Sequence, residues 1–385
     1  MHLAPTQAQS RLRAELRQYF HALLPDGPPE DPVRRRALLR RIGADGLLGL
    51  GWPVEYGGRG RGPDEQFVFF DEAHRAGAPV SMVTLNTVGP TLMRHGTQEQ
   101  KAYFLPRILA GDLVFAIGYS EPGAGTDLAS LRTRAVREGA DWVIDGQKIF
   151  TSNAQHADWI WLACRTDPQA PRHRGISIVL VPTDAPGFSW TPIDTVGGLT
   201  TTSTYYDAVR VPAANLVGPE HGGWGLITDQ LNHERVALAA LGMQAEEFYE
   251  AALAHARTPD PATGERPADR PWVRSRLAEA HARLAAVRLL NWRLVQDVAG
   301  SALAPGDASG VKFLGTESAV EVYRMCQEVV GEEALVRGPG PAAFAGGELE
   351  RMNRAAQINT FGGGVSEVQR EIVAMMRLGM KGRKR

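Results

Sequence analysis

Apolar residues recur at helical spacing in the first part of the chain. Leu12, Leu16 and Phe20 repeat every four residues, which is typical of a helix with one buried face. A glycine-rich segment over 46–62 interrupts this pattern and predicts a loop. Residues 1–112 are therefore expected to form a helical domain.

The pattern changes over 113–215, where short β-rich runs are separated by turn residues. Two of these runs are 159–164 and 176–181. Asp145-Gly146 stands between two further runs and predicts a hairpin, because a type I′ turn needs positive φ. The spacing favours a small antiparallel barrel or sandwich.

Helical spacing returns over 216–385. One apolar stripe contains Ile227, Glu234 and Ala252, and a second stripe covers 273–287. The order is a helical domain, a β domain and a second helical domain, so the expected fold class is α+β.

Composition and charge exclude several classes of protein. The hydrophobic fraction is 43% and the charged fraction 22%, as in ordinary globular proteins. The net charge is −1 and the arginines are dispersed among acids, which argues against nucleic acid or an anionic membrane as partner. No apolar run is long enough to cross a bilayer, and the amino terminus lacks a signal-peptide pattern. The 2 cysteines exclude a disulfide framework and have no metal-ligand spacing, so we expect a cytoplasmic protein without a metal.

The segment Tyr119–Asp127, with sequence YSEPGAGTD, is a candidate cofactor loop. Glycine permits close backbone approach, and serine and threonine hydroxyls can donate to a cofactor. No Gly-Lys-Ser/Thr follows, so the segment is not a P-loop. A simple turn between two elements is the alternative.

Glu234 is the candidate general base. It occupies a position on an apolar stripe, and burial raises the pKa of a carboxyl group towards neutral pH. The alternative is a structural ion pair with an arginine of another helix. The pattern by itself leaves both roles open.

The segment Phe361–Arg370, with sequence FGGGVSEVQR, opens the last helix. Ser366 with Gln369 fits a capping box. The glycines would let a ligand come close, and the helix start could receive a pyrophosphate. A capped helix without any ligand is the alternative.

Together these motifs resemble the acyl-CoA dehydrogenase family over nearly the whole chain. The two loops resemble its T-E-P-G-A-G-S-D and G-T-S-E-I-Q-R signatures. Further matches, in the family's order, are Gly51–Gly58, Asp145–Lys148 with Thr151–Asn153, and Val209–Pro212. The resemblance implies a helical amino-terminal domain, a middle antiparallel β-barrel, a carboxy-terminal helical bundle and bound FAD.

The resemblance also implies which residues contact FAD. Ser120 would donate its hydroxyl, the Phe150 ring would lie beside the isoalloxazine, and Ser152 would place a hydroxyl near N5. The full set carried over by position, with Arg257 as the candidate for the pyrophosphate, is Ile117, Tyr119, Ser120, Gly125, Thr126, Phe150, Ser152, Arg257, Gly364 and Gln369.

The chain departs from the family at the commonest position of the catalytic base. That base is a glutamate in a Tyr-Glu-Gly-Thr sequence, whereas residues 362–365 here are Gly-Gly-Gly-Val. In the isovaleryl and long-chain branches the base lies in a helical Glu-Arg pair, which Glu234-Arg235 resembles. The resemblance therefore favours Glu234 as the base. It implies that Thr126, Asn232, Arg235 and Gly363 contact the substrate.

The predicted function is FAD-dependent α,β-dehydrogenation of an acyl-CoA thioester, with Glu234 removing the α-proton and a hydride passing to flavin N5. An electron-transfer flavoprotein is the expected electron acceptor. The sequence over 354–367 resembles the actinobacterial steroid side-chain branch, which includes α2β2 heterotetramers. The expected assembly is therefore a homodimer, a homotetramer or an α2β2 heterotetramer. One alternative is a flavoenzyme of the same fold that acts on a carrier-bound acyl group or works as an N-hydroxylase or reductase. Another is a structural subunit of a heterotetrameric dehydrogenase.

Overall fold

A computed structural model describes residues 5–29, 31–230, 242–261, 263–299 and 304–381. The chain divides into two compact units. The amino-terminal unit consists of the described residues of Arg13–Thr195 and Thr200–Glu234. The carboxy-terminal unit consists of those of Met1–Leu12, Val196–Leu199 and Arg235–Arg385. The domain boundaries expected after residues 112 and 215 stay a prediction.

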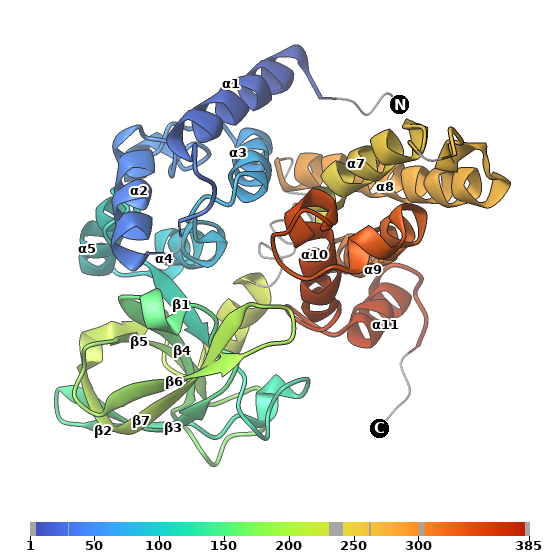
Figure 1. Ribbon diagram of the computed structural model, residues 1–385. Coiled ribbons are helices and arrows are strands. Elements are labelled where there is room, and N and C mark those ends of the chain that lie inside the picture. Colours follow the sequence, from blue (N-terminus) through green and yellow to red (C-terminus); the bar gives the residue numbers. More distant parts are fainter. Residues whose placement is uncertain (1–4, 30, 231–241, 262, 300–303, 382–385) are drawn as a thin grey trace. The chain divides into compact units, whose positions relative to one another are not determined.

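The first part of the chain is helical, as predicted (Figure 1). Its α-helices are α1 (Gln7–Leu23), α2 (Pro32–Ala44), α3 (Pro63–Arg75), α4 (Gly89–His95) and α5 (Gln98–Leu109). Leu12, Leu16 and Phe20 are all buried, so the spacing identified the inner face of α1. The glycine-rich segment is a loop that contains one short 3-10 turn, Val54–Tyr56.

Two buried carboxylates connect α3 to α1. Asp71 and Glu72 are 1% and 2% exposed, and the guanidinium of Arg13 contacts both. Arg75 lies 2.9 Å from Asp71, and Arg17 lies 2.9 Å from Glu72. Since buried charges are stable only when they are paired, this network holds α1 on α3.

The middle of the chain forms one mixed sheet (Figure 1). Its strands are β1 (Phe115–Gly118), β2 (Arg134–Glu138), β3 (Asp141–Lys148), β4 (Trp159–Arg165), β5 (Ile176–Pro182), β6 (Phe188–Asp194), β7 (Thr200–Pro212) and β8 (Leu216–Val217). The strand order is β6-β7-β3-β2-β4-β5-β8, and β1 pairs with β4. Most neighbours are antiparallel, but β1 runs parallel to β4 and one residue pair joins β2 to β4 in parallel. The β domain is confirmed, with two parallel pairings that the sequence did not indicate.

The predicted hairpin turn at Asp145-Gly146 is wrong. Both residues lie inside β3, and the register with β7 shifts between Ile144 and Gly146, as in a β-bulge. Gly146 has φ 150, and a Cβ there would lie 2.6 Å from the Thr133 hydroxyl oxygen. The turn between β2 and β3 is at Gly139, where φ is 62. A bulge and a type I′ turn both use glycine at positive φ, so the Asp-Gly pair by itself does not distinguish them.

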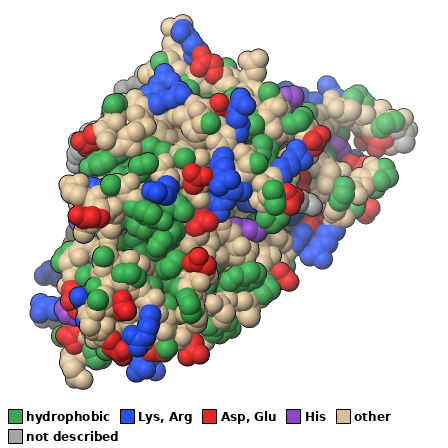
Figure 2. Space-filling view, turned by 90° about the vertical axis from the view of Figure 1, so that its left-hand side faces the viewer, with side chains coloured by type: hydrophobic (Ala, Val, Ile, Leu, Met, Phe, Trp, Pro, Cys, Tyr) green, Lys and Arg blue, Asp and Glu red, His purple; other side chains and the backbone are tan. Residues whose placement is uncertain are grey.

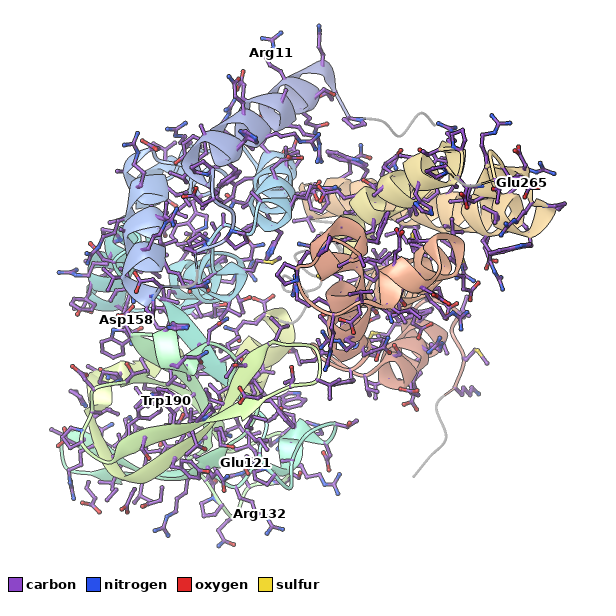
Figure 3. All side chains as sticks on the ribbon, in the orientation of Figure 1. Arg11, Glu121, Arg132, Asp158, Trp190 and Glu265 are labelled. Atoms are coloured by element: carbon purple, nitrogen blue, oxygen red, sulfur yellow. The ribbon has the colours of Figure 1, made fainter. Side chains whose placement is uncertain are left out.

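Within the amino-terminal unit, side chains of α2 and α5 bind the sheet. The Gln100 amide of α5 donates to the carbonyls of Ala214 and Leu216, at 2.7 and 2.8 Å. Arg36 of α2 pairs with Asp158 at 2.9 Å, just before β4 (Figure 3). These contacts fix the end of the sheet at which β1 and β4 begin.

The remaining helices build the carboxy-terminal unit. They are α7 (Ala245–Arg257), α8 (Pro271–Ala299), α9 (Pro305–Val330), α10 (Glu348–Ala356) and α11 (Ser366–Met376). Val273, Leu277, Ala280 and Leu284 are buried in a core cluster with residues of α9, which confirms the second stripe. The middle of the first stripe lies outside the described residues.

The molecular surface has no concentrated charge on the face that Figure 2 shows. Basic and acidic side chains are mixed over that face. Among the described helices, none is long and apolar enough to cross a membrane.

Burial of His74 predicts a pH dependence of stability. Burial lowers the pKa of His74 to about 4, from 6.5 for an ordinary histidine. The unfolded chain takes up this proton first as pH falls, so stability present above about pH 6.5 is lost towards pH 4. We expect His74 to account for a loss of about 2 kcal/mol in the free energy of unfolding between pH 7 and pH 5. Urea unfolding of the wild type and His74→Gln at both pH values measures it; equal losses in the two proteins would contradict the assignment.

Candidate functional site

The segment after β1 forms a tight loop with an exposed tip. Glu121 and Ala124 exchange two backbone hydrogen bonds of 3.0 Å and close a four-residue turn. Gly125 and Thr126 follow this turn and are exposed. A Cβ at Gly125 would meet nothing within 4 Å, so a ligand could approach the backbone and the Thr126 hydroxyl here.

A buried ion pair holds this loop from below. Lys148 of β3 is fully buried, and its ammonium donates to Glu121 at 2.8 Å and to the carbonyl of Tyr119 at 3.0 Å. Glu121 also accepts from the backbone N–H of Arg132 and Thr133, at 2.7 and 2.8 Å; Glu121 and Arg132 are labelled in Figure 3. Burial by itself would raise the pKa of Glu121, but Lys148 and the N–H donor of Thr133 outweigh burial and hold that pKa below its usual range.

The segment after β3 lies beside the first loop. The N–H of Ile149 donates to the carbonyl of Ser120 at 2.9 Å, which brings the two strand ends together. Phe150 has φ 60, an uncommon conformation for phenylalanine, and its side chain is 61% exposed. Thr151 beyond it is buried and donates its N–H to Thr202 at 2.9 Å, while Ser152 is exposed. An exposed ring and exposed hydroxyls therefore lie on two adjoining segments, and such groups can contact a ligand with a ring system and polar atoms, such as a flavin.

Ile117 and Tyr119, two of the predicted flavin contacts, also contact residues of the amino-terminal unit. Ile117 pairs with Trp161 in the sheet and is half-buried. The Tyr119 hydroxyl bonds to Gln230 and to Trp161 inside the unit. The hydroxyl of Tyr119 therefore has partners in the protein, which the sequence did not indicate.

The glycine segment of the carboxy-terminal unit is held by a second buried lysine. Lys312 of α9 is 1% exposed and donates to the carbonyls of Asn359 and Gly364, at 2.8 and 2.6 Å. Gly363 and Gly364 have φ of 66 and 111, which favours glycine. Lys312 was not among the predicted site residues, and its signal in the sequence is a lone cation among apolar and small residues in Gly310–Leu314.

The predicted capping box of the last helix is wrong. Helix α11 begins at Ser366, its N-cap is Val365, and no side chain of the described residues caps it. The Ser366 hydroxyl instead donates to the carbonyl of Thr360 at 3.1 Å. Gln369 is 1% exposed, and its side-chain oxygen has no partner among the described residues. That oxygen is a buried acceptor that an N–H donor of a ligand could satisfy.

The predicted site residues are divided between the two units. Those from Ile117 to Ser152 lie in the amino-terminal unit, whereas Arg257 and the segment Gly363–Gln369 lie in the carboxy-terminal unit. Arg257 is the exposed last residue of α7. Three predicted residues, Asn232, Glu234 and Arg235, lie outside the described residues. Among those described, no cluster of three or more metal-ligating side chains occurs.

Comparison with protein families decides the identity of this arrangement. Three family models match in order: the acyl-CoA dehydrogenase N-terminal domain at 6–112, its middle domain at 116–209 and its C-terminal domain at 221–378. The chain belongs to the acyl-CoA dehydrogenase family. It is therefore an oxidoreductase of a flavoprotein family, and its reaction is acyl-CoA dehydrogenation, as the sequence motifs predicted.

Named relatives match this acyl-CoA dehydrogenase over nearly their full length. Acyl-CoA dehydrogenase FadE26 of Mycobacterium tuberculosis is 49% identical, and the match covers 99% of both chains. A solved structure named Tcur3481-Tcur3483 steroid ACAD is 53% identical with a TM-score of 0.93, covering 99% of this chain and 100% of that one. The ChsE4-ChsE5 complex from Mycobacterium tuberculosis is 49% identical with a TM-score of 0.92, at the same coverage. The high TM-scores extend the similarity from motifs to the whole fold.

Removing the charge of Lys148 should lower the stability of the protein, because Lys148 pairs with buried Glu121. Lys148→Met leaves the carboxylate of Glu121 buried without a counterion, so we expect the free energy of unfolding to fall by about 3–5 kcal/mol. The double variant Lys148→Met/Glu121→Gln removes both charges and should regain part of this loss. Urea unfolding of the three proteins tests the pair. A double variant that is less stable than Lys148→Met would contradict it.

A side chain at Gly364 should strain the glycine segment. Gly364→Ala forces alanine to φ 111 and places its Cβ 2.2 Å from the Gln369 side-chain nitrogen, so we expect a loss of about 1–3 kcal/mol. Gly310→Ala on α9 is the matched control: its nearest atom would be 3.6 Å away, and we expect a gain of about 0.5–1 kcal/mol. Thermal or urea unfolding compares the two. Equal stability of both variants would show that the segment relaxes freely.

Proposed function

We propose that this acyl-CoA dehydrogenase uses FAD to form the α,β double bond of a bulky acyl-CoA of the steroid side-chain type. The main supporting observation is that the adjoining segments at Ser120 and Phe150 carry an exposed ring, hydroxyls and an uncrowded glycine. The substrate class is supported by a 53% identical solved relative whose name contains the words steroid ACAD.

Each unit, taken by itself, presents groups that suit one part of FAD. Ser120, Thr126 and Ser152 offer hydroxyl donors to the flavin, and the exposed Phe150 ring offers it a flat apolar surface. The unpartnered buried oxygen of Gln369 suits an amino donor such as that of adenine.

Arg257 and Gly364 are proposed to contact the rest of the cofactor. Arg257 is an exposed cation suited to the pyrophosphate. Gly364 brings the backbone close to the Gln369 side chain, because glycine carries no Cβ. When bound, the flavin supplies the acceptor for the hydride that leaves the β-carbon.

Glu234 is proposed as the base that removes the α-proton. Its support is the Glu234-Arg235 pair, together with the absence of any carboxylate at 362–365, where the family commonly places its base. Asn232, Arg235, Thr126 and Gly363 are proposed to contact the acyl-CoA. Since Gly363 has no side chain, it leaves space for a bulky acyl group.

The proposed assembly contains more than one chain, and its electrons are proposed to pass to an electron-transfer flavoprotein. Exposed apolar side chains gather near the carboxy terminus, where Phe361, Met376, Leu378 and Met380 are each 58% to 67% exposed. Such residues are typical of a surface that another subunit covers. One relative of known structure is a ChsE4-ChsE5 complex, which favours a heteromer, and homodimers and homotetramers are the other candidates.

A cytoplasmic location is proposed because both cysteines are free and buried. Burial raises the pKa of Cys164 and of Cys326 to about 12, so neither thiol is activated for disulfide exchange.

Replacing Glu234 tests the mechanism. Glu234→Gln keeps the size of the side chain but cannot accept the α-proton, so we expect anaerobic flavin reduction by a steroid-type acyl-CoA to slow by roughly 100- to 10,000-fold. Glu250→Gln, at an exposed position on α7, is the matched control and should behave as the wild type. The measurement is loss of flavin absorbance after mixing, across acyl-CoAs from short to branched to steroid-like.

The outcomes separate the parts of the proposal. Unchanged reduction of Glu234→Gln would remove Glu234 as the base and leave dehydrogenation intact. Reduction of the wild type by short acyl-CoAs alone would overturn the steroid-type substrate. If only a carrier-bound acyl group reduces the flavin-loaded wild type, the substrate is an acyl-carrier thioester and not an acyl-CoA.

A further inference from the structure

The hydroxyl of Tyr119 joins three elements of the amino-terminal unit. Tyr119 directly follows β1 and opens the loop of the candidate flavin site. The indole N–H of Trp161 on β4 donates to this hydroxyl at 3.2 Å. The hydroxyl in turn donates to the side-chain oxygen of Gln230, on the helical segment 223–230. Donor and acceptor functions of the hydroxyl are therefore both used.

Gln230 depends on Tyr119 for its orientation. It is 1% exposed, and its side-chain nitrogen has no partner among the described residues. A buried amide donor without a partner is unfavourable by about 1–3 kcal/mol, so a glutamine here is poorly explained by stability alone. The Tyr119 hydroxyl is the described polar group that holds the amide.

The helical segment 223–230 is anchored at its other end and along its side. The backbone at Gly223 approaches β5 so closely that a Cβ would lie 2.8 Å from the Ile176 carbonyl. Asp229 pairs with Arg94 of α4, and Ile227 is buried. The Gln230 contact therefore connects an already fixed helix to the loop.

We propose that Tyr119 and Gln230 are a positioning pair for the dehydrogenation. Their hydrogen bond fixes the loop that begins at Tyr119 relative to the helix, and thereby the geometry in which flavin and acyl-CoA meet. Gln230 also precedes Glu234 by four residues in the sequence. This inference rests on the proposed function for the role of the loop in binding FAD.

A double-mutant cycle on the flavin-loaded enzyme tests the pair. Tyr119→Phe removes the hydroxyl, Gln230→Met removes the amide at similar volume, and the double variant removes both. Thr228→Val is the matched control, because the hydrogen bonds of the exposed Thr228 hydroxyl within the described residues go to carbonyls of its own helix. The readouts are the rate of anaerobic flavin reduction at saturating acyl-CoA, the KM for acyl-CoA, the dissociation constant for FAD and the urea midpoint.

We expect each single variant to reduce its flavin roughly tenfold more slowly with KM little changed, because small misplacements of reacting groups lower the rate steeply. The dissociation constant for FAD should rise about fivefold, the value of one net hydrogen bond. The double variant should be no worse than Tyr119→Phe, since both lose the bond to Gln230 and the contact from Trp161. Thr228→Val should match the wild type.

Three results would overturn the pair. The first is wild-type reduction rates in both single variants. The second is a double variant whose effect equals the product of the two single effects. The third is a lower urea midpoint without any change in reduction rate or FAD affinity, which would mean a structural role only. If no acyl-CoA reduces the wild type, the proposed function fails, and the FAD dissociation constants still decide whether the pair acts on the loop.

Discussion

The candidate flavin site depends on one buried ion pair, Lys148 with Glu121. A cation and a carboxylate that are removed from water are stable only if the remaining donors and acceptors are also satisfied. Here Glu121 accepts hydrogen bonds from two backbone N–H groups, and Lys148 donates one to the carbonyl of Tyr119. The pair therefore joins the exit of β1, the entry to β2 and the end of β3. The exposed hydroxyls above it owe their place to this contact, because a glycine-containing loop has little conformational preference of its own.

The carboxy-terminal unit solves the same physical problem in a related way. Its glycine segment has carbonyls outside any regular ladder, and such groups need partners when buried. Lys312 supplies donors to two of them, at Asn359 and Gly364. An ammonium has three donors that rotate freely, so it can satisfy irregular backbone that a planar amide would fit less well. Each signature segment is thus held by a buried lysine of its own unit.

Membership of the family and the course of the reaction rest on different residues. The family models match from residue 6 to residue 378, whereas the chemistry needs one base at one place. The three glycines at 362–364 remove the commonest carboxylate and leave Glu234 as the candidate. The contact from Tyr119 to Gln230 joins the loop of the candidate flavin site to the helical segment 223–230 within one unit.

The sequence by itself determined which regions of the chain are helical and which is β-rich, because helical and strand periodicities are local. The spacing of Leu12, Leu16 and Phe20, and that of 273–287, identified buried faces correctly. Motif order further determined the family. The tertiary structure decided that Gly146 forms a bulge and that Ser366 is no cap, because both depend on which backbone lies opposite. It also decided the burial of Lys148 and Lys312 and the meeting of Tyr119 with Gln230. Those partners are 27 to 111 residues apart in the chain, beyond the reach of any local pattern.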